Sequence, residues 1–345
     1  MIAGRIEGET VAAWQPHVHL AAAITERDRA HAFAERIAAP FDAPPIAHDE
    51  PQPLLVTGGR WVVVTEQKGL VERTTFLIPR FTWLDAFRQT AQPAPMRRWV
   101  GPMLVAGTRY RENHFHWLFQ NIGTVMMARS LGLDPTIPVL LPPMTDQLRQ
   151  PLDLFGIPNP VETLPDDALA ILTEGVLSTA CSGDHGMTPH PAMLDMLRSE
   201  AARVTGAQRA GRKIYLSRRD AANRRLPLNE EEVVAALAAR GFEIVAPGEL
   251  SWADQIRLFR EAAIIVAPHG AALSNLAWTE DGANGPIVIE LLQENFTNRA
   301  FARMAQVKRL NYHAIICECA QRAELLIDTR GRIDLPLLLG LLDQL

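Results

Sequence analysis

The stretch IIVAPHGAALSN, Ile264–Asn275, decides the fold of this chain. Its apolar, β-branched start has no period-two alternation, which is typical of a parallel strand buried on both faces. At Pro268 it breaks into His269-Gly270-Ala271-Ala272 and then takes a helical pattern. Small residues there let a ligand approach the backbone, and the start of the following helix offers N–H groups and a positive dipole end to an anion. The stretch predicts a phosphate site at a strand-to-helix turn; the alternative is a tight turn around a buried histidine.

Strands and helices alternate along most of the chain. In the second half we expect strands at 213–220, 242–247, 264–268, 287–292 and 312–318, and helices at 191–205, 229–241, 251–262, 298–309 and 335–345. In the first half we expect strands at 103–107, 136–142 and within 168–179, and helices at 113–132 and 146–156. Such alternation is typical of parallel sheets covered by helices on both faces.

The first hundred residues have a different pattern. We expect residues 1–50 to be irregular apart from one short helix near 26–36. Residues 54–79 combine β-branched and aromatic residues with glycines, which predicts a β-ribbon. The fold class is therefore α/β, with two Rossmann-like domains whose parallel sheets face a central cleft. We divide the chain into a domain with the ribbon at 1–200 and a second domain at 201–345.

Two helix starts carry capping signals. Asn229 with Glu232, and Ser251 with Asp254, have the spacing of a capping box. Gly241 stands where a helix C-terminal glycine belongs.

Length and composition limit the class of protein. A chain of 345 residues is long enough for about two domains, and 48% hydrophobic with 21% charged residues is ordinary for a soluble globular protein. A net charge of −5 without a basic block argues against nucleic-acid binding. Three cysteines, Cys181, Cys317 and Cys319, form no disulfide framework, which favours a reducing compartment.

Targeting signals are absent from the sequence pattern. We expect no signal peptide in the first residues and no transmembrane helix, because no run of about 18 apolar residues occurs. The expected location is cytoplasmic, and peripheral association with the inner face of the membrane stays open.

Several common catalytic motifs are missing. The sequence has no G-x-G-x-x-G after an early strand, no G-x-x-x-x-G-K-[ST] and no G-x-S-x-G. These absences disfavour a nicotinamide or flavin site, a P-loop and an α/β-hydrolase. No Asp-x-Asp pair is present to hold a divalent ion against a diphosphate. A phosphate site in this chain must therefore neutralise charge with side chains and backbone groups.

Arginines follow the first strand of the second domain. Ser217, Arg218 and Arg219 stand where this strand ends, and ligands of parallel sheets bind outside the carboxyl ends of the strands. An arginine there can hold a phosphate with two hydrogen bonds. Arg218 is the first candidate, and either Arg224 or Arg225 in the next loop is the second. The alternative is that these arginines are solvated surface charges.

Two further polar residues are candidates for donor binding. Glu290 lies inside the apolar strand 287–292, where an ionised carboxylate is costly unless it is paired or bound to a ligand. We predict that it binds ribose hydroxyls. Asn275, in the first turn of the helix after His269, contacts the ligand or caps the helix locally.

Histidines mark the first domain. Asn113-His114-Phe115-His116-Trp117 opens a helix after the strand at 103–107. Two histidines at this spacing do not share a helix face, so they are poor metal ligands. A single histidine suits a general base, because its unperturbed pKa is close to working pH. We predict this role for His116 rather than His114, and His185 and His190 are weaker candidates.

The ordered landmarks in residues 213–292 resemble glycosyltransferase family 61. They are the strand YLSR, a following arginine and Asn-Glu, the helix start SWADQI, the turn PHGAALSN and the later strand IVIEL. Ala272 stands where that family more often has glycine, and Pro227 lengthens the loop after Arg225. Weaker similarity extends over His116-Trp117-Leu118 and the C-terminal tail.

The resemblance implies a GT-B fold, with a nucleotide-sugar donor held by the C-terminal domain. It also implies a metal-independent, inverting transferase that uses a UDP-sugar and needs no cofactor, and bacterial relatives make capsules or exopolysaccharides. The partners implied are the donor and a glycan or glycolipid acceptor. The donor residues expected are Ser217, Arg218, Arg225, His269, Gly270, Ala271, Ala272 and Asn275, with Glu290 on the ribose.

The expected reaction is a single in-line displacement with His116, or a nearby carboxylate, as general base. Two other classes stay open at this point. A nucleotide-sugar epimerase shares this fold and its anion sites, and would act without an acceptor. A non-catalytic protein that binds nucleotides or carbohydrates would keep the fold and not need His116.

Overall fold

The chain forms two compact units. A computed structural model describes residues 4–66, 69–71, 82–181, 189–206, 211–221, 225–324 and 328–345. Unit 1 comprises residues 1–9 and 42–193, and unit 2 comprises residues 10–41 and 194–345. The first segment of unit 2 therefore lies between the two segments of unit 1 in the sequence.

This division differs from the expected boundary at residue 200. Strand β3 (His17–Leu20) pairs in parallel with β17 (Tyr312–Gln321), which places residues 10–41 in unit 2. Helix α1 (Arg27–Ala38) confirms the short helix expected near 26–36. The pairing joins positions almost 300 residues apart, and no local sequence pattern reveals such a partner.

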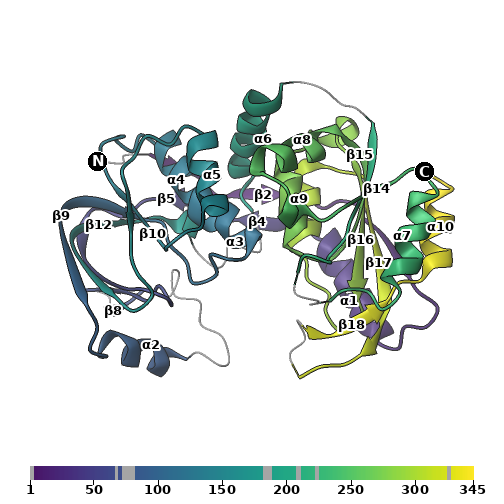
Figure 1. Cartoon of the computed structure of the whole chain (residues 1–345), viewed down its shortest axis with the longest axis horizontal. Coiled ribbons are helices and arrows are strands. Elements are labelled where there is room, and N and C mark those ends of the chain that lie inside the picture. Colours follow the sequence, from purple (N-terminus) through teal and green to yellow (C-terminus); the bar gives the residue numbers. More distant parts are fainter. Residues whose placement is uncertain are drawn as a thin grey trace. The chain divides into compact units, whose positions relative to one another are not determined.

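Unit 2 is built on a predominantly parallel sheet (Figure 1). Its order is β14-β13-β15-β16-β17, with β3 parallel and β18 antiparallel to β17. In chain order this is 2-1-3-4-5, so the order reverses between β13 and β15. Ligands of doubly wound sheets bind at such a switch point. The strands are β13 (Arg212–Leu216), β14 (Glu243–Val245), β15 (Ala262–Pro268), β16 (Ile287–Gln293) and β18 (Arg330–Arg332).

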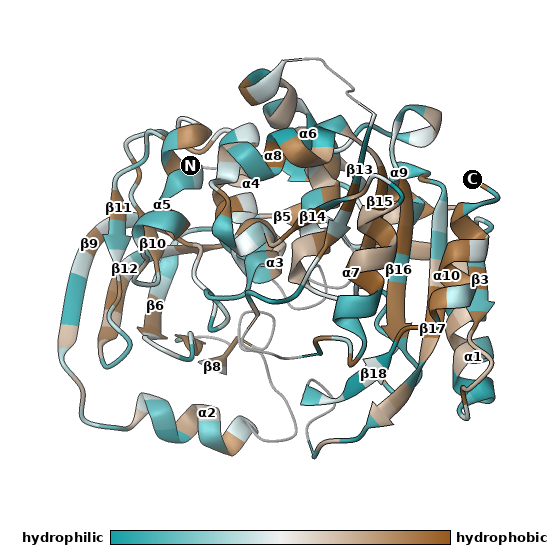
Figure 2. Cartoon of the chain, turned by 45° about the vertical axis from the view of Figure 1, so that its right-hand side comes forward, coloured by the Kyte–Doolittle hydropathy of each residue, from teal (hydrophilic) through white to brown (hydrophobic). Residues whose placement is uncertain are grey.

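Helices cover both faces of this sheet, as the sequence predicts. On one face α7 and α10 bury Leu237 and Leu338 against Val266, Ile289 and Ile315 of the central strands. Figure 1 shows α8 and α9 on the other side of β15 and β16, which are largely hydrophobic in Figure 2. The helices are α6 (Pro191–Thr205), α7 (Glu230–Ala238), α8 (Trp252–Glu261), α9 (Ala300–Lys308) and α10 (Leu335–Leu342), with short 3₁₀ turns η3 (Pro247–Glu249) and η5 (Gly282–Asn284).

The two expected capping pairs have different outcomes. The Ser251 hydroxyl accepts a hydrogen bond from the Asp254 backbone N–H at 3.1 Å, which confirms that cap. The Asn229 side chain makes no cap on α7. It instead donates to the carbonyl of Ile333 and accepts from its N–H, both at 2.9 Å. The capping-box prediction at Asn229 is wrong because the segment after β18 competes for the same amide.

Unit 1 contains a mixed sheet, not the wholly parallel one expected. The order is β11-β10-β9-β12-β6-β7-β8. The first four strands are parallel, and in chain order they read 3-2-1-4, which reverses between β9 and β12. Strands β6, β7 and β8 pair antiparallel and confirm the ribbon up to residue 70; residues 72–79 lie outside the described part. The bounds are β6 (Gln52–Thr57), β7 (Val63–Thr65), β8 (Gly69–Leu70), β9 (Met96–Val105), β10 (Val139–Leu141), β11 (Val161–Thr163) and β12 (Leu169–Leu177).

The helices of unit 1 include one that the pattern did not predict, α2 (Trp83–Thr90). The helix expected at 113–132 is present in three parts, α3 (His114–His116), the π-helix η1 (Trp117–Ile122) and α4 (Gly123–Ser130). Short strand pairs occupy the region expected to be irregular. The strand pairs are β1 (Arg5–Ile6) with β5 (Ile46–Ala47) and β2 (Glu9–Val11) with β4 (Phe41–Ala43). The remaining helices are α5 (Asp146–Leu154) and the 3₁₀ turn η2 (Thr179–Cys181).

A buried carboxylate fastens α1 to the sheet of unit 2. Glu294, just after β16, accepts hydrogen bonds from the backbone N–H groups of Thr25 at 2.6 Å, Glu26 at 2.8 Å and Cys319 at 3.1 Å. Burial alone would raise the pKa of Glu294, but these N–H donors outweigh it and hold the pKa below its ordinary value. The carboxylate therefore serves as a cap for a helix more than 250 residues away in sequence.

Replacing Glu294 with glutamine should destabilise the protein by about 1–3 kcal/mol, because an amide cannot accept from three donors as a carboxylate does. A carboxylate with a depressed folded pKa stabilises above the unfolded pKa of about 4.5 and loses this contribution as the pH falls below it. Urea unfolding between pH 3 and 7 measures both effects. Glu35→Gln, on the exposed face of α1, is the control and should leave the free energy of unfolding unchanged at each pH. The same pH dependence of this free energy in both variants would contradict the role of Glu294.

Candidate functional site

The carboxyl ends of β13 and β15 meet at the switch point of unit 2. Arg218 follows β13, and His269 and Gly270 follow β15. The Arg218 guanidinium donates a hydrogen bond from Nη1 to the carbonyl oxygen of His269 at 3.2 Å. The structure thus brings together the two segments that the sequence singled out.

Gly270 is required by this arrangement. Its φ of 178° is extended, so the backbone conformation does not demand glycine. A Cβ atom at this position, however, would lie 1.7 Å from Nη1 of Arg218. The guanidinium therefore passes over the bare backbone of Gly270 and lies directly against the turn.

The Arg218 guanidinium is largely withdrawn from water. Burial lowers its pKa, and the negative charges of Asp220 and Glu230 oppose this effect. An arginine remains protonated in proteins, so this is a partly desolvated cation. An anionic ligand at the turn would offset its desolvation.

The Ser217 hydroxyl is committed to another residue. Ser217 is buried and donates to Glu230 Oε1 at 2.7 Å, while Tyr215 OH donates to Glu230 Oε2 at 2.6 Å. Glu230, the first residue of α7, thereby joins β13 to its helix. This arrangement differs from the ligand contact expected for Ser217, which here positions the segment that carries Arg218.

A buried chain of hydrogen bonds runs from His269 across the sheet. Its Nδ1–H donates to Glu290 Oε1 in a very short contact, and Tyr312 OH donates to Glu290 Oε2 at 2.6 Å. Glu290 is completely buried. The ribose contact expected for Glu290 does not fit this placement, because both of its oxygens bind groups of the protein and none is exposed.

The electrostatic surroundings keep His269 neutral. Burial is the largest effect and lowers its pKa; Glu290 opposes this, and the charges of Arg225 and Arg218 lower it further. With the proton on Nδ1 held by Glu290, the Nε2 atom points away from the carboxylate. Both arginines thus act on His269 at the same turn.

Arg225 is the second cation near the turn. Its guanidinium lies over the ring of Phe296, 4.7 Å from the centroid, and Arg225, Phe296 and His269 line one pocket. Its φ of 55° is uncommon for a residue other than glycine and marks a constrained backbone. Arg225 thus lies beside His269 in this structure; Arg224 lies outside the described residues.

The helix expected after the turn is present as a 3₁₀-helix, η4 (Ala271–Trp278). Asn275 Nδ2 donates to the carbonyl of Ala272 at 3.0 Å, an acceptor that an α-helix would use for the N–H of residue 276. The same amide group donates to Gln255 Oε1 at 3.0 Å, and Asn275 Oδ1 accepts from Trp278 Nε1 at 2.7 Å. Asn275 is fully buried, so local capping is its role in this structure. Ala271 and Ala272 remain half-buried at the start of η4.

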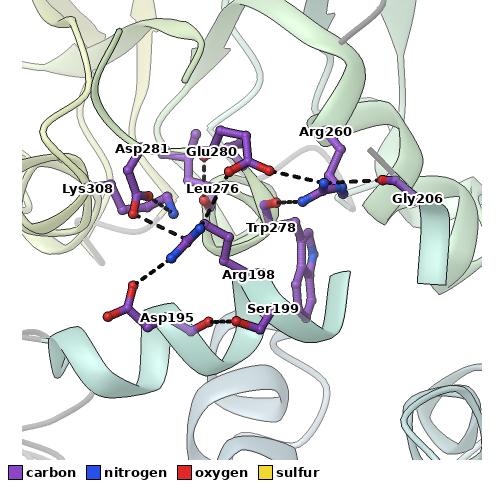
Figure 3. A network of polar contacts seen from close by, with 11 residues as sticks. Asp195, Arg198, Ser199, Gly206, Arg260, Leu276, Trp278, Glu280, Asp281 and Lys308 are labelled. Atoms are coloured by element: carbon purple, nitrogen blue, oxygen red, sulfur yellow. Dashed lines mark hydrogen bonds and ion pairs between the residues drawn. The ribbon is translucent and has the colours of Figure 1, made fainter. Parts of the chain in front are cut away.

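Cations from three helices anchor the far end of η4 (Figure 3). Glu280 and Asp281 follow η4. Arg198 of α6 contacts both carboxylates at 3.6 and 3.3 Å, Arg260 of α8 contacts Glu280 at 3.1 Å, and Lys308 of α9 contacts Asp281 at 2.5 Å. Arg260 and Lys308 are buried, but Glu280 and Asp281 are each 40% exposed, so water partly screens these ion pairs. Together the contacts tie the end of η4 to three helices.

Unit 1 has a second polar cluster, after the carboxyl end of β9. His116 Nδ1–H donates to Gln120 Oε1 at 2.6 Å, and the Tyr110 ring lies 4.9 Å from the imidazole. Burial lowers the pKa of His116, and the bond to Gln120 only partly opposes this. His116 immediately precedes η1, and π-helical turns are frequent at functional sites. The neutral imidazole is the form of a histidine that can accept a proton.

The other histidines have different surroundings. His114 is the first residue of α3. His190 is buried, donates from Nε2 to the carbonyl of Glu7 at 3.0 Å and accepts at Nδ1 from the N–H of Ala192, which is a structural role at the start of α6. His185 lies outside the described residues. Arg219 is exposed beside Arg218.

With this geometry in place, one comparison identifies the chain. The family model described as Glycosyltransferase 61 matches residues 102–285, more than half of the chain. The chain belongs to glycosyltransferase family 61. It is therefore an enzyme that transfers sugars, and family membership implies a GT-B-like fold, a nucleotide-sugar donor and an acceptor. No curated protein matches the sequence significantly.

The match includes His116, Arg218 and the turn at His269 of this transferase, and Glu290 and Tyr312 lie beyond its end. No helix in the described ranges is long and apolar enough to span a membrane. In those ranges no group of three or more His, Cys, Asp or Glu residues is arranged to hold a metal ion.

Sequence reasoning missed three polar partners in these clusters: Glu230, Tyr312 and Gln120. Glu230 follows Asn229 in the run NEEE, and an acidic first turn is usually attributed to the helix dipole. Gln120 is four residues after His116, which on a helix is the same face and would have been a usable signal. Tyr312 begins a strand remote from Glu290 in sequence, and only the register of β16 and β17 brings them together.

Proposed function

We propose that this transferase moves a sugar from a UDP-sugar to a glycan or glycolipid acceptor by a single inverting displacement without a metal ion. Unit 2 would bind the donor diphosphate at the switch point between β13 and β15. The proposed donor contacts are Arg218, Arg225 and the backbone of the turn His269–Ala272. The observation that carries this proposal is the Arg218 guanidinium lying across Gly270 against the carbonyl of His269.

Two guanidinium groups at one turn suit a diphosphate leaving group. In the displacement, the bond from the anomeric carbon to the diphosphate oxygen breaks and negative charge grows on that oxygen. Arg218 and Arg225 lie where they can stabilise this charge, and they are held by the surrounding contacts before the reaction begins. Their fixed positions supply the electrostatic stabilisation that a divalent ion supplies in other transferases.

His269 has a supporting role in this proposal. Glu290 fixes the tautomer and orientation of the imidazole, and Tyr312 in turn fixes Glu290. Nε2 can then accept a proton or a hydrogen bond from the bound donor. Glu290 is accordingly proposed as a positioning residue, in place of the ribose contact expected from the sequence.

His116 of unit 1 is proposed as the general base. Its neutral imidazole can take the proton of the acceptor hydroxyl while that oxygen attacks the anomeric carbon from the side opposite the diphosphate. The short bond to Gln120 holds the ring in place. We place the reaction in the synthesis of capsular or extracellular polysaccharide in the cytoplasm.

A thermal-shift screen against nucleotides and nucleotide sugars, with and without EDTA, tests the donor assignment. A ligand at about 100 times its dissociation constant adds about 2.7 kcal/mol of stability. We expect UDP and one UDP-sugar to raise Tm equally with and without EDTA. No shift with any nucleotide would overturn the donor site, and a shift abolished by EDTA would overturn the metal-free mechanism.

Gly270→Ala should abolish most of the UDP-induced shift while leaving Tm of the free protein nearly unchanged. The new Cβ would meet only the far end of the Arg218 side chain, which can move, so the fold survives but the guanidinium leaves the turn. Gly340→Ala is the matched control, because nothing lies within 4 Å of a Cβ there. A full UDP shift in Gly270→Ala would mean that Arg218 does not bind the donor from this position.

A further inference from the structure

Exposed apolar side chains gather in one part of unit 1. Among the described residues six large apolar side chains are exposed, and five of them lie between Trp83 and Val100. Trp83, Leu84 and Phe87 are on α2, with 43%, 58% and 58% of their surfaces exposed. Clustering of this kind is unusual, because single exposed apolar residues are normally scattered over a protein surface.

The three side chains share one face of α2. Positions 83 and 87 are four residues apart and positions 84 and 87 are three apart, so they are neighbours on the helix surface. Ala86, three residues after Trp83, lies beside these side chains and is the residue that packs on unit 1, fully buried with Val62 and Leu70. Figure 2 shows α2 with hydrophobic and hydrophilic segments interleaved. We call Trp83, Leu84 and Phe87 the α2 patch.

Positive charge accompanies the α2 patch. The charged residues in 83–100 are Asp85 and three arginines, Arg88, Arg97 and Arg98. Asp85 is engaged in the capping box with Thr82. Its pKa is lowered first by these bonds to Thr82 and then by the charges of Arg88 and Arg60, so Arg60 adds a further cation nearby. The chain as a whole carries a net charge of −5, and this region has the opposite sign.

We propose that the α2 patch docks on the anionic surface of a phospholipid bilayer. A short helix with Trp, Leu and Phe on one side and arginines at its border fits the interface, where the rings enter the headgroup region and the guanidinium groups meet phosphate. A second copy of this chain fits less well, since a two-fold interface pairs the patch with itself and offers its arginines no surface of opposite charge. This inference is independent of the proposed donor site.

Sedimentation of the full chain with vesicles tests the docking. We expect the protein to pellet with phosphatidylcholine mixed with phosphatidylglycerol, to stay in solution with phosphatidylcholine alone, and to be released by high salt. The triple variant Trp83→Ser, Leu84→Ser, Phe87→Ser should bind at least about tenfold more weakly. Arg88→Glu should weaken binding to anionic vesicles about fivefold or more.

Leu345→Ser is the matched control. Leu345 is 44% exposed and is not part of the α2 patch, so this variant should leave vesicle binding unchanged. Equal Tm for all variants shows that the fold is intact. The inference is overturned if the native chain stays in solution with anionic vesicles, or if the triple variant pellets as the native chain does. It is also overturned if neither protein binds vesicles and light scattering finds that the native chain is a dimer and the triple variant a monomer.

Discussion

Arg218→Ala should lower kcat/KM for sugar transfer by about 10²–10³-fold while the protein stays folded. Removing one preorganised donor to a developing negative charge costs this much in other enzymes. The guanidinium of Arg218 is held against the carbonyl of His269 and is largely withdrawn from water, so alanine would remove a positioned cation from the turn. Steady-state kinetics with the donor identified in the thermal-shift screen measures the loss.

Two companion variants make this result specific. Arg218→Lys keeps the charge but loses the planar fork, so it should recover only part of the activity. Arg219→Ala removes the exposed neighbouring arginine and should behave like the native enzyme. If Arg218→Ala and Arg219→Ala are equally active, Arg218 is a structural residue and the diphosphate binds elsewhere.

His116→Ala should lower kcat by about 10²–10⁴-fold with little change in donor binding, because it removes the proposed base and leaves unit 2 untouched. The native enzyme should show a matching pH profile. Burial places the pKa of His116 below its ordinary value of 6.5, so the base is neutral and active above that value. Activity should therefore stay level from pH 8 to about 6.5 and fall only at lower pH.

The profile also tests the bond between His116 and Gln120. That bond raises the pKa of His116, so Gln120→Ala should move the acid limb to still lower pH. His114→Ala, two residues away, should leave the limb where it is in the native enzyme. A rate that does not depend on His116, or an acid limb that persists in His116→Ala, would assign the base to another group.

The Rossmann-like part of unit 2 could be predicted because its signals are local. The apolar runs of β15, β16 and β17 and the Ser251 cap each fix an element from a few neighbouring residues. The antiparallel edge of unit 1 and the placement of β3 could not be predicted in the same way. Both depend on which strands pair at long range, and the pattern of β3 is compatible with several partners.

The candidate site also has parts that local sequence signals predict and parts that depend on long-range pairing. That Arg218 lies beside His269 and Gly270 could be predicted, because both segments stand at the carboxyl ends of parallel strands, which meet at one edge of the sheet. The ribose contact expected for Glu290 does not fit the structure, because hydrogen bonds from other residues of the protein occupy both oxygens of this carboxylate. Tyr312 and the Nδ1–H of His269 supply these hydrogen bonds, and their approach depends on strand register rather than on spacing. Ser217 and Asn275 are similar cases, because their side chains bind Glu230 and the carbonyl of Ala272 within the protein.

The pairing of β3 with β17 has a consequence for how this protein is made. At a translation rate of about 5–20 residues per second, the ribosome reaches Tyr312 roughly 15–60 s after it has finished Leu20. During that interval β3 has no partner strand, and α1 lacks the carboxylate of Glu294. A fragment that begins at Leu194 would in turn leave one edge of β17 bare at His313–Ile316, ready to recruit a foreign strand. Unit 2 can be produced by itself only if residues 10–41 are supplied with it.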